Sequence, residues 1–289
     1  MPGRALATAY IDEGTAGVGS ETVLGIDLPR VVVLAGDPVD ERGYGHLGYT
    51  LRREFGIPFT AVRADRFARL DLRTVDVLVL PPGNPRGYRA ALGDEGIERL
   101  RRWVRDGGVL VGIAGGAVFL ADPQLELATA RVVGREGEEE EGKEKADTLG
   151  YLPPTHGTPV APLPAARAGE RAPLPVPGAI VRAAVDRTHP FTFGYETDAI
   201  AVLLRGADFL TRSKEGSHPI AFVGDSLRLA GFLWPENTER YLRDTAYLVD
   251  EPNGDGRVVL FQGDPVFRLA WPALGRLLVN VLLLGPTLR

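Results

Sequence analysis

The sequence contains no cysteine among its 289 residues. This absence excludes disulfide bonds, thiolate metal sites, iron–sulfur clusters and any cysteine nucleophile. It leaves the compartment open, because a chain without cysteine is equally stable in oxidising and reducing surroundings. Whatever chemistry the chain performs must therefore use other side chains.

The chain also lacks an excess of positive charge and a long apolar run. Its net charge is −5, with 33 Lys and Arg against 38 Asp and Glu, which is not the charge pattern of a nucleic-acid or anionic-membrane binder. The N-terminus has no apolar signal-peptide core, and Arg276 and Asn280 interrupt the most apolar C-terminal stretch. We therefore expect no nucleic-acid partner, no membrane span and no signal peptide in this chain.

Short apolar runs alternate with amphipathic segments over residues 29–122, and this alternation predicts an α/β fold. β-branched runs at 30–36, 59–62, 75–80 and 109–113 have the composition of strands buried on both faces of a parallel sheet. Between them, helical spacing occurs at Leu47, Leu51 and Phe55, and again after Asp94, a candidate N-cap. The pattern predicts a doubly wound, mostly parallel sheet of the flavodoxin-like kind.

The rest of the chain divides into a tail, an insertion and a β-rich part. Residues 1–28 read as a tail or the remnant of a preceding domain, and residues 29–289 as one α/β domain. An acidic run followed by a Pro-rich stretch predicts a flexible insertion at 134–178. Short β-like runs at 179–182, 200–204, 220–223 and 256–261 and an amphipathic helix after Leu274 predict the β-rich C-terminal part.

Two glycine-rich segments follow predicted strands. Gly43-Tyr-Gly-His-Leu-Gly48 matches the dinucleotide-binding pattern, but seven residues starting at Gly36 separate it from the strand, so we favour an ordinary glycine-rich loop there. Gly112-Ile-Ala-Gly-Gly116 lies at a sharp strand-to-helix junction and has the layout of a nucleophile elbow. The apex residue of this elbow is Ala114, whose methyl group cannot attack a carbonyl.

These segments resemble the class I glutamine amidotransferase-like superfamily. There the elbow is Gly-x-Cys-x-Gly, and a His-Pro-Glu segment after a late strand completes the triad; here Asp264-Pro-Val266 stands in its place. The resemblance makes Ala114, Asp264 and Val266 degenerate triad positions. It also implies that Gly83, in Pro81-Pro-Gly83, helps to shape the oxyanion pocket. The candidate ligand-binding residues are Gly83, Gly112, Ala114, Gly115, Gly116 and Asp264.

A closer resemblance covers nearly the whole chain. The segments at 29–36, 75–83, 176–182, 189–195, 231–237 and 256–268 resemble, in this order, the amidotransferase-like domain that follows the catalytic domain of some bacterial M14-type zinc carboxypeptidases. No histidine here has Glu at the third following position, so the zinc-binding pair of that family is absent. The resemblance implies a noncatalytic accessory domain that contains no zinc itself. Its expected partner is a peptidase domain, in cis or trans, and export of the parent protein stays open; a homo-oligomer is a further expectation.

Three smaller features are weighed separately. His189 is a weak candidate for a general base oriented by Asp186 or Asp264, although a structural role is favoured. Asp264 is expected to pair with Arg268. The turn at 234–237 is a candidate ligand or partner surface.

The sequence thus leaves three functions open. The first is the noncatalytic accessory domain, with a role in stability, assembly or presentation of a ligand or substrate. The second is a hydrolase that uses acid–base groups such as Asp264 or His189 in place of a thiolate. The third is a protein that binds a small ligand or anion at the Gly112–Gly116 turn.

Overall fold

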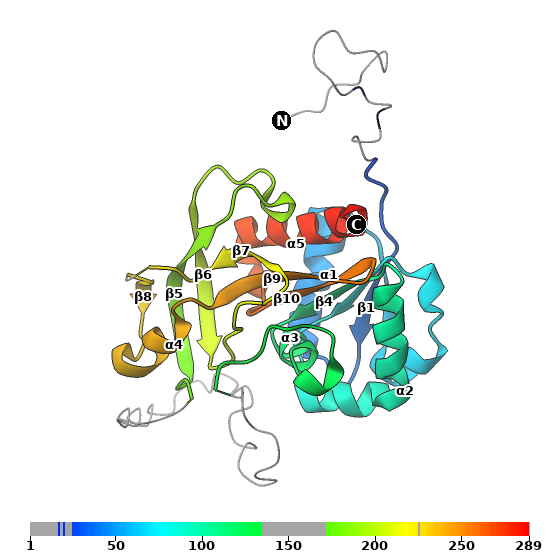
Figure 1. Ribbon diagram of the computed structural model, residues 1–289, viewed down its shortest axis with the longest axis horizontal. Coiled ribbons are helices and arrows are strands. Elements are labelled where there is room, and N and C mark those ends of the chain that lie inside the picture. Colours follow the sequence, from blue (N-terminus) through cyan, green and yellow to red (C-terminus); the bar gives the residue numbers. More distant parts are fainter. Residues whose placement is uncertain (1–16, 18–19, 21–24, 135–171, 225, 289) are drawn as a thin grey trace.

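The computed structural model describes residues 17, 20, 25–134, 172–224 and 226–288 (Figure 1). Most of the expected tail and of the expected insertion lies outside the described residues. The C-terminal end of the insertion, expected at residue 178, falls inside a strand that begins at Val176. Among the described residues, no helix has the length and apolar character needed to cross a bilayer.

One ten-stranded sheet crosses the described part of the chain (Figure 1). Its order is β2-β1-β3-β4-β10-β9-β7-β5-β6, with β8 paired to β5. The five strands from β2 to β10 are parallel, and the remaining pairings are antiparallel. The strands are β1 (Val31–Ala35), β2 (Phe59–Arg63), β3 (Val77–Leu80), β4 (Val109–Ile113), β5 (Val176–Val185), β6 (Ala199–Gly206), β7 (Ser217–Ala221), β8 (Arg228–Gly231), β9 (Ala246–Asn253) and β10 (Gly256–Phe261).

Helices cover both faces of the parallel half. α1 and α5 pack on one face of the sheet, and α2 and α3 pack on the other; in Figure 1, α5 lies above the strands and α2 and α3 lie below them. The α-helices are α1 (Glu41–Tyr49), α2 (Pro85–Arg105), α3 (Gly115–Leu120), α4 (Arg240–Leu242) and α5 (Pro272–Leu284). Short 3-10 or π turns used below are η1 (Thr50–Glu54), η5 (Pro190–Thr192), η6 (Pro235–Glu239) and η7 (Phe267–Leu269).

Side chains along each strand point alternately to the two faces of the sheet, and this divides the hydrophobic core into two clusters. Val31 and Val33 of β1 pack with the α1 and α5 side, whereas Val32 and Leu34 pack with the α2 and α3 side. Successive side chains of a strand point to opposite faces, so a strand covered on both sides must be apolar at every position. This explains the uninterrupted apolar runs from which the α/β class was predicted.

One local prediction for the first half was incomplete and one was wrong. The helix expected from Asp94 is the second segment of α2, which follows the non-helical Gly93 (φ 63°, ψ 174°); the first segment, which begins at Pro85 with Asn84 as its N-cap, was not predicted. The Gly43–Gly48 segment, expected as a loop, forms most of α1, where Asp40 caps the Gly43 N–H at 2.7 Å. The glycines that match the nucleotide pattern therefore lie within a helix and do not form a phosphate-binding loop.

Two strands of the second half escaped prediction. β9 is buried from Ala246 to Glu251, yet the last two residues of this buried stretch are Asp250 and Glu251, two residue types that strands rarely bury. β8 is exposed along its length and pairs only with β5. Both signals are weak in sequence, because β9 carries buried charge and β8 has only four residues.

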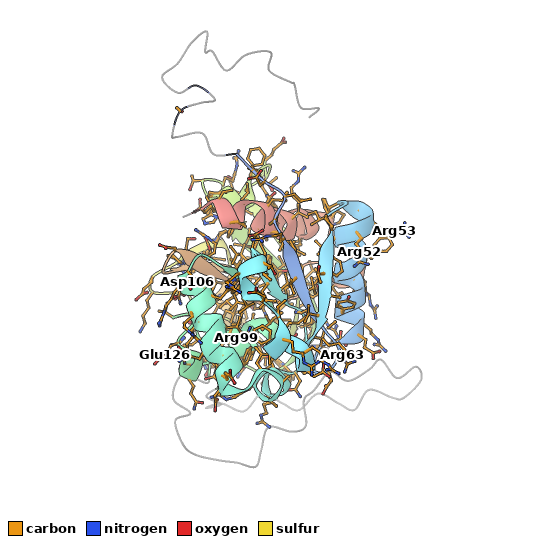
Figure 2. The ribbon with its side chains drawn as sticks, turned by 90° about the vertical axis from the view of Figure 1, so that its right-hand side faces the viewer. Arg52, Arg53, Arg63, Arg99, Asp106 and Glu126 are labelled. Atoms are coloured by element: carbon orange, nitrogen blue, oxygen red, sulfur yellow. The ribbon has the colours of Figure 1, made fainter. Side chains whose placement is uncertain are left out.

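The free edge of the sheet at β2 is flanked by arginines. Figure 2 shows Arg52 and Arg53 at one end of β2 and Arg63 at the other. The Arg63 guanidinium forms an exposed ion pair with Asp65 at 3.0 Å. Charged side chains beside an edge strand oppose pairing with another chain, so this edge has a form of protection from sheet-to-sheet association.

Candidate functional site

The predicted elbow is present at the end of β4. Ala114 has φ 48° and ψ −114°, an unusual conformation for a residue with a side chain. Its N–H donates to the Phe261 carbonyl of β10 at 2.8 Å, and its carbonyl accepts from the Val118 N–H at 2.9 Å as α3 begins. The strained turn of a nucleophile elbow is thus retained, and the side chain at its apex is a methyl group.

The glycines of the elbow are needed for close packing. A Cβ on Gly115 would lie 1.8 Å from the Gly83 carbonyl oxygen, and one on Gly116 would lie 2.3 Å from the Leu80 carbonyl oxygen. A Cβ on Gly112 would lie 2.8 Å from the Ala117 nitrogen. The loop after β3 therefore lies against the elbow. Backbone packing accounts for these glycines without a ligand.

Asp264 and Val266 lie beside α1 in the loop after β10. Asp264 Oδ1 accepts from the Val266 N–H at 3.0 Å, and Asp264 Oδ2 lies 3.8 Å from Nδ1 of His46. The expected pair of Asp264 with Arg268 is not formed; instead the Arg268 backbone N–H donates to His46 Nδ1 at 3.3 Å. Val266 is 3% exposed and packs in the core.

Burial raises the pKa of the Asp264 carboxyl to about 6. The hydrogen bond from Val266 and the nearby His46 act in the opposite direction, and the carboxylate of Asp40 adds to the increase. The side chain is 12% exposed. A carboxyl group that holds its proton at mildly acidic pH is typical of a ligand-binding or catalytic site.

A cavity of about 290 Å³ opens directly beside this carboxyl group. Its lining residues are Asp40, Arg42, Gly43, His46, Asp264, Phe267 and Arg268. Of the ligand-binding residues predicted from sequence, only Asp264 lines it, so the cavity lies beside the elbow and is not centred on Gly112–Gly116. The loop that closes the cavity is strained, because the non-glycine residues Arg268 (φ 52°) and Leu269 (φ 56°) both have a left-handed backbone conformation.

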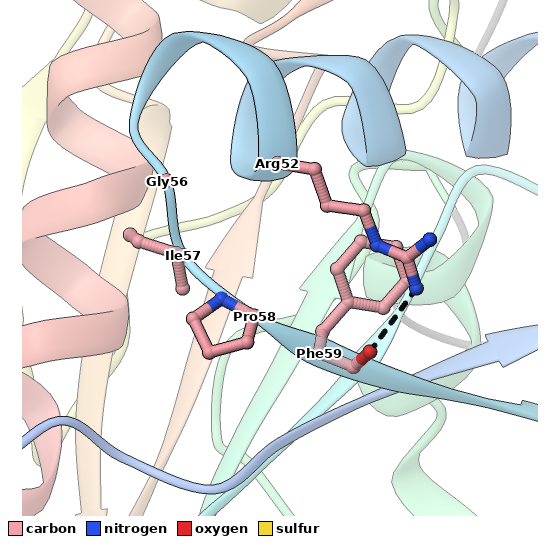
Figure 3. Close-up of a pocket in the computed structure, with 5 residues that line it drawn as sticks. All are labelled: Arg52, Gly56, Ile57, Pro58 and Phe59. Carbon is pink, nitrogen blue, oxygen red and sulfur yellow. Dashed lines mark hydrogen bonds between the residues drawn. The ribbon is translucent and has the colours of Figure 1, made fainter.

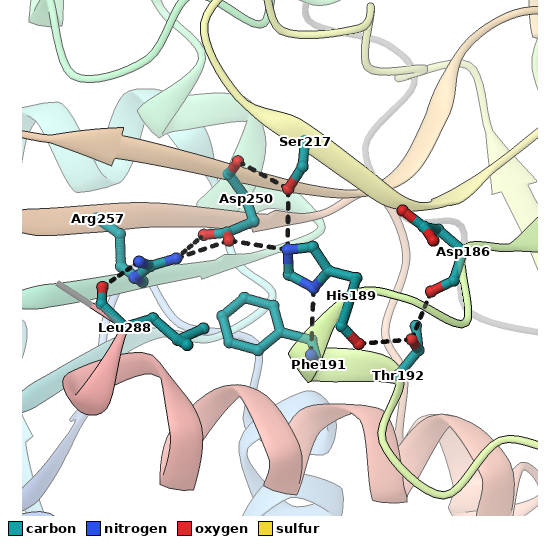
Figure 4. Close-up of polar contacts among 8 residues, drawn as sticks. All are labelled: Asp186, His189, Phe191, Thr192, Ser217, Asp250, Arg257 and Leu288. Carbon is teal, nitrogen blue, oxygen red and sulfur yellow. Dashed lines mark hydrogen bonds and ion pairs between the residues drawn. The ribbon is translucent and has the colours of Figure 1, made fainter. Parts of the chain in front are cut away.

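His189 belongs to a second, separate polar cluster (Figure 4). Its Nε2 lies 3.2 Å from Asp250 Oδ2 and 2.9 Å from the Ser217 hydroxyl. Arg257 binds both Asp250 carboxylate oxygens and also donates to the Leu288 carbonyl. Neither acid expected to orient His189 does so: Asp186 accepts from the Thr188 N–H at 2.9 Å, and Asp264 lies beside His46.

The hydrogen bonds of His189 do not suit a general base. Its Nδ1 accepts from the Phe191 N–H at 3.1 Å, capping η5. In the neutral imidazole the proton then resides on Nε2, the nitrogen that faces both Asp250 and Ser217. A catalytic triad needs Nε2 free to take the serine proton and the acid on Nδ1. These contacts are those of a histidine that caps a turn and joins buried polar groups, and a structural role for His189 stays the favoured interpretation.

The hollow beside the β2 edge is built differently (Figure 3). It has a volume of about 370 Å³ and is lined by Arg52, Gly56, Ile57, Pro58 and Phe59. The Arg52 guanidinium lies 4.3 Å from the Phe59 ring centroid and donates to the Phe59 carbonyl at 3.3 Å. Its single charged group is thus engaged in local contacts, and the hollow lacks the acid–base groups of the Asp264 cavity.

The turn at 234–237 forms part of η6. Asn237 is 4% exposed; its side chain accepts from the Leu174 N–H at 2.7 Å and donates to the Ala172 carbonyl at 3.1 Å. This asparagine fixes the chain entering β5, so the prediction of a surface contact is wrong for it. In the described ranges no three His, Asp or Glu side chains cluster in a way that would hold a metal ion.

Sequence reasoning missed His46, Asp40 and Phe267 as site residues. In the sequence, His46 lies inside the glycine motif and lacks the spacing of a zinc ligand. The signal that could have found it is helical spacing: Asp40, Gly43 and His46 recur every three residues and share one face of α1. That face meets the loop after β10, which contains Asp264, the acid predicted from the sequence as a site residue.

Comparisons with known proteins show the fold. No protein-family profile and no curated protein sequence matches the chain. A solved cytoplasmic protein from Salmonella typhimurium is similar at 14% identity and a TM-score of 0.52, covering 88% of this chain and 97% of that one. A second cytoplasmic protein, from Salmonella typhimurium LT2, is similar at 13% identity and 0.50, covering 88% and 98%.

A ThuA-like protein from Bacteroides uniformis is similar at 11% identity and a TM-score of 0.50, covering 94% of this chain and all (100%) of that one. At such identities the likeness shows the fold alone. Together with the sheet order it confirms the α/β, flavodoxin-like fold class predicted from the sequence.

Proposed function

We propose that this chain is a non-hydrolytic, amidotransferase-like module. The observation that carries the proposal is the elbow: Ala114 occupies its apex in the strained conformation that presents a nucleophile, but carries only a methyl group. The two remaining triad positions hold Asp264 and Val266, neither of which supplies an imidazole. A module that has lost hydrolytic activity would keep the backbone of the elbow without the nucleophile and the histidine base, and this chain has that combination.

The test is hydrolysis by the pure, native chain supplied with zinc. L-Glutamine and a peptide with a cleavable C-terminal residue are the two substrates. The proposal expects no release of ammonia or amino acid above the protein-free rate. Turnover that increases in proportion to protein concentration would overturn it.

The proposal further assigns the module to a zinc carboxypeptidase of the M14 type, as an accessory domain that aids stability, assembly or substrate presentation. Support comes from the ordered series of resembling segments, which spans the chain from Pro29 to Arg268. The test is the mass of the native polypeptide in the source cells. A product much larger than 31.1 kDa with upstream peptides that contain His-x-x-Glu is expected, and a product of the chain's own mass, without a co-purifying peptidase, would overturn this assignment.

The cavity beside α1 favours a second function, binding of a small ligand. It combines an enclosed carboxyl group with a raised pKa, a histidine and a strained loop, all within one space of about 290 Å³. Ligand binding is compatible with the loss of hydrolysis. The test is perturbation of the His46 imidazole resonance by added small molecules, with His46→Gln assigning that resonance; no perturbation by any class of compound would refute this function.

A further inference from the structure

Positive groups from two elements line the cavity beside α1. Arg42 and His46 come from α1, and Arg268 comes from the loop after β10. Asp40 also lines this space, and its Oδ2 accepts from the Gly43 N–H at 2.7 Å as the cap of α1. The cavity thus combines two arginine side chains with the carboxyl groups of Asp40 and Asp264.

Asp264 presents one oxygen to that space. Its Oδ1 is occupied by the Val266 N–H at 3.0 Å, and its Oδ2 lies 3.8 Å from His46 Nδ1, beyond hydrogen-bond length. His46 Nδ1 instead accepts from the Arg268 N–H at 3.3 Å. When Asp264 is protonated, its Oδ2–H is thus available to a ligand as a hydrogen-bond donor.

The wall of the cavity is aromatic. The Phe267 ring lies edge-on to the His46 ring, with centroids 6.0 Å apart. The guanidinium carbons of Arg268 and of Arg205, from β6, lie 5.2 and 5.0 Å from the Phe267 centroid. A flat apolar surface surrounded by cations favours an organic anion over a bare inorganic ion.

We propose that this cavity binds a small organic carboxylate of about one ring in size, held by Arg42 and Arg268 and by a hydrogen bond from the carboxyl group of Asp264. The inference rests on the second proposed function, ligand binding in this cavity, and names the class of ligand. Guanidinium groups recognise a carboxylate through charge-assisted hydrogen bonds. A protonated carboxyl group can share its proton with a second carboxylate, and the aromatic wall favours an organic carboxylate over phosphate.

Binding of such a ligand is coupled to a proton. The charged and titratable groups that face Asp264 are Asp40, Arg42 and His46 from α1, Arg268 from its own loop, and Tyr247 from β9. An ionised Asp264 repels a carboxylate, and a protonated one donates to it.

The experiment is calorimetric titration of the full chain with benzoate, benzamide and inorganic phosphate at about pH 5 and about pH 7.5. Because the pKa of Asp264 is about 6, linkage to one proton predicts that benzoate binds roughly thirtyfold more weakly at the higher pH. Benzamide and phosphate are expected to bind at least about tenfold more weakly than benzoate at the lower pH.

Three variants locate the site. Arg268→Asn removes a positive charge from the cavity, and asparagine tolerates the left-handed backbone at this position. If this variant fails to fold, Arg42→Gln removes the other arginine charge, on α1. Each should weaken benzoate binding about tenfold or more. Asp264→Asn keeps a donor without a titrating proton, so its affinity should change much less with pH. Arg53→Gln, an exposed arginine away from the cavity, is the control and should bind as the native chain does.

The outcomes separate the two proposals. Equal binding of benzamide and benzoate, or an affinity for benzoate that does not change with pH, would refute the carboxylate assignment and leave ligand binding in place. Tighter binding of phosphate than of benzoate would also refute the carboxylate assignment. If no probe perturbs the His46 resonance, both the assignment and the ligand-binding function fail.

Discussion

Arg257 binds both carboxylate oxygens of Asp250 through one nitrogen, at 2.7 and 2.6 Å, and the two side chains are only 10% and 6% exposed. The pair joins β9 to β10 and, through the Leu288 carbonyl, to the end of the described chain (Figure 4). His189 and Ser217 complete this cluster. A near-triad that looks catalytic by composition is therefore a buried support for the sheet.

Arg257→Met should destabilise the fold strongly. It leaves the Asp250 carboxylate buried without its guanidinium, and breaking a buried pair in this way costs about 3–5 kcal/mol. Urea denaturation measures the change. Arg63→Met, which breaks the exposed pair with Asp65, is the matched control and should change stability little, because water screens an exposed ion pair. Equal losses in the two variants would contradict the assigned role.

Gly115→Ala should prevent or severely weaken folding. The added Cβ would lie 1.8 Å from the Gly83 carbonyl oxygen, and neither backbone segment can move away without separating the elbow from the loop after β3. We expect a loss of about 3 kcal/mol or more. Gly45→Ala is the control, because nothing lies within 4 Å of its added Cβ in α1. It should stabilise the helix by about 0.5–1 kcal/mol, and thermal unfolding of the two variants would test the contrast.

Asp264 should make stability depend on pH in a defined direction. Its pKa in the folded chain is about 6, above the ordinary 3.8. The folded state therefore takes up the proton before the unfolded state does, and the free energy of unfolding falls as pH rises from about 4 to about 6. Above this window the ionised, buried group costs the fold up to about 3 kcal/mol.

Asp264→Asn removes that cost. The variant should be more stable than the native chain at about pH 7.5 and of similar stability at about pH 4, as measured by urea denaturation at both values. A native chain that gains stability on passing from the lower to the higher pH, relative to this variant, would show that the carboxylate is stabilised in the fold and contradict the assignment.

The parallel half of the fold was predictable because its signal is repeated. Every residue of β3 and β4 is buried, so each strand is an unbroken apolar run. The elbow was predictable because Gly112, Gly115 and Gly116 mark a backbone too close to its neighbours for a side chain. In both cases the cause is local and leaves a pattern in consecutive residues.

The site was less predictable because its members come from distant segments. His46 and Asp264 meet only after the sheet brings the loop after β10 beside α1. Asp250 was missed for a related reason, since its charge argued against a buried strand and its partner Arg257 lies across the hairpin on β10. Pairing of buried charges is a tertiary property, and no spacing rule within one segment reports it.

The most direct test of the account is glutamine hydrolysis by Ala114→Cys. The native chain has no cysteine, so this variant restores a single thiol at the apex of the elbow, and Ala61→Cys, at an exposed position of β2, is the control. Because the proposed function assigns Asp264 and Val266 to the positions of the base and of its orienting acid, and neither is an imidazole, it predicts no turnover by either variant above the native rate. Glutamine hydrolysis by Ala114→Cys alone would contradict it, since it would show that the rest of the catalytic machinery survives.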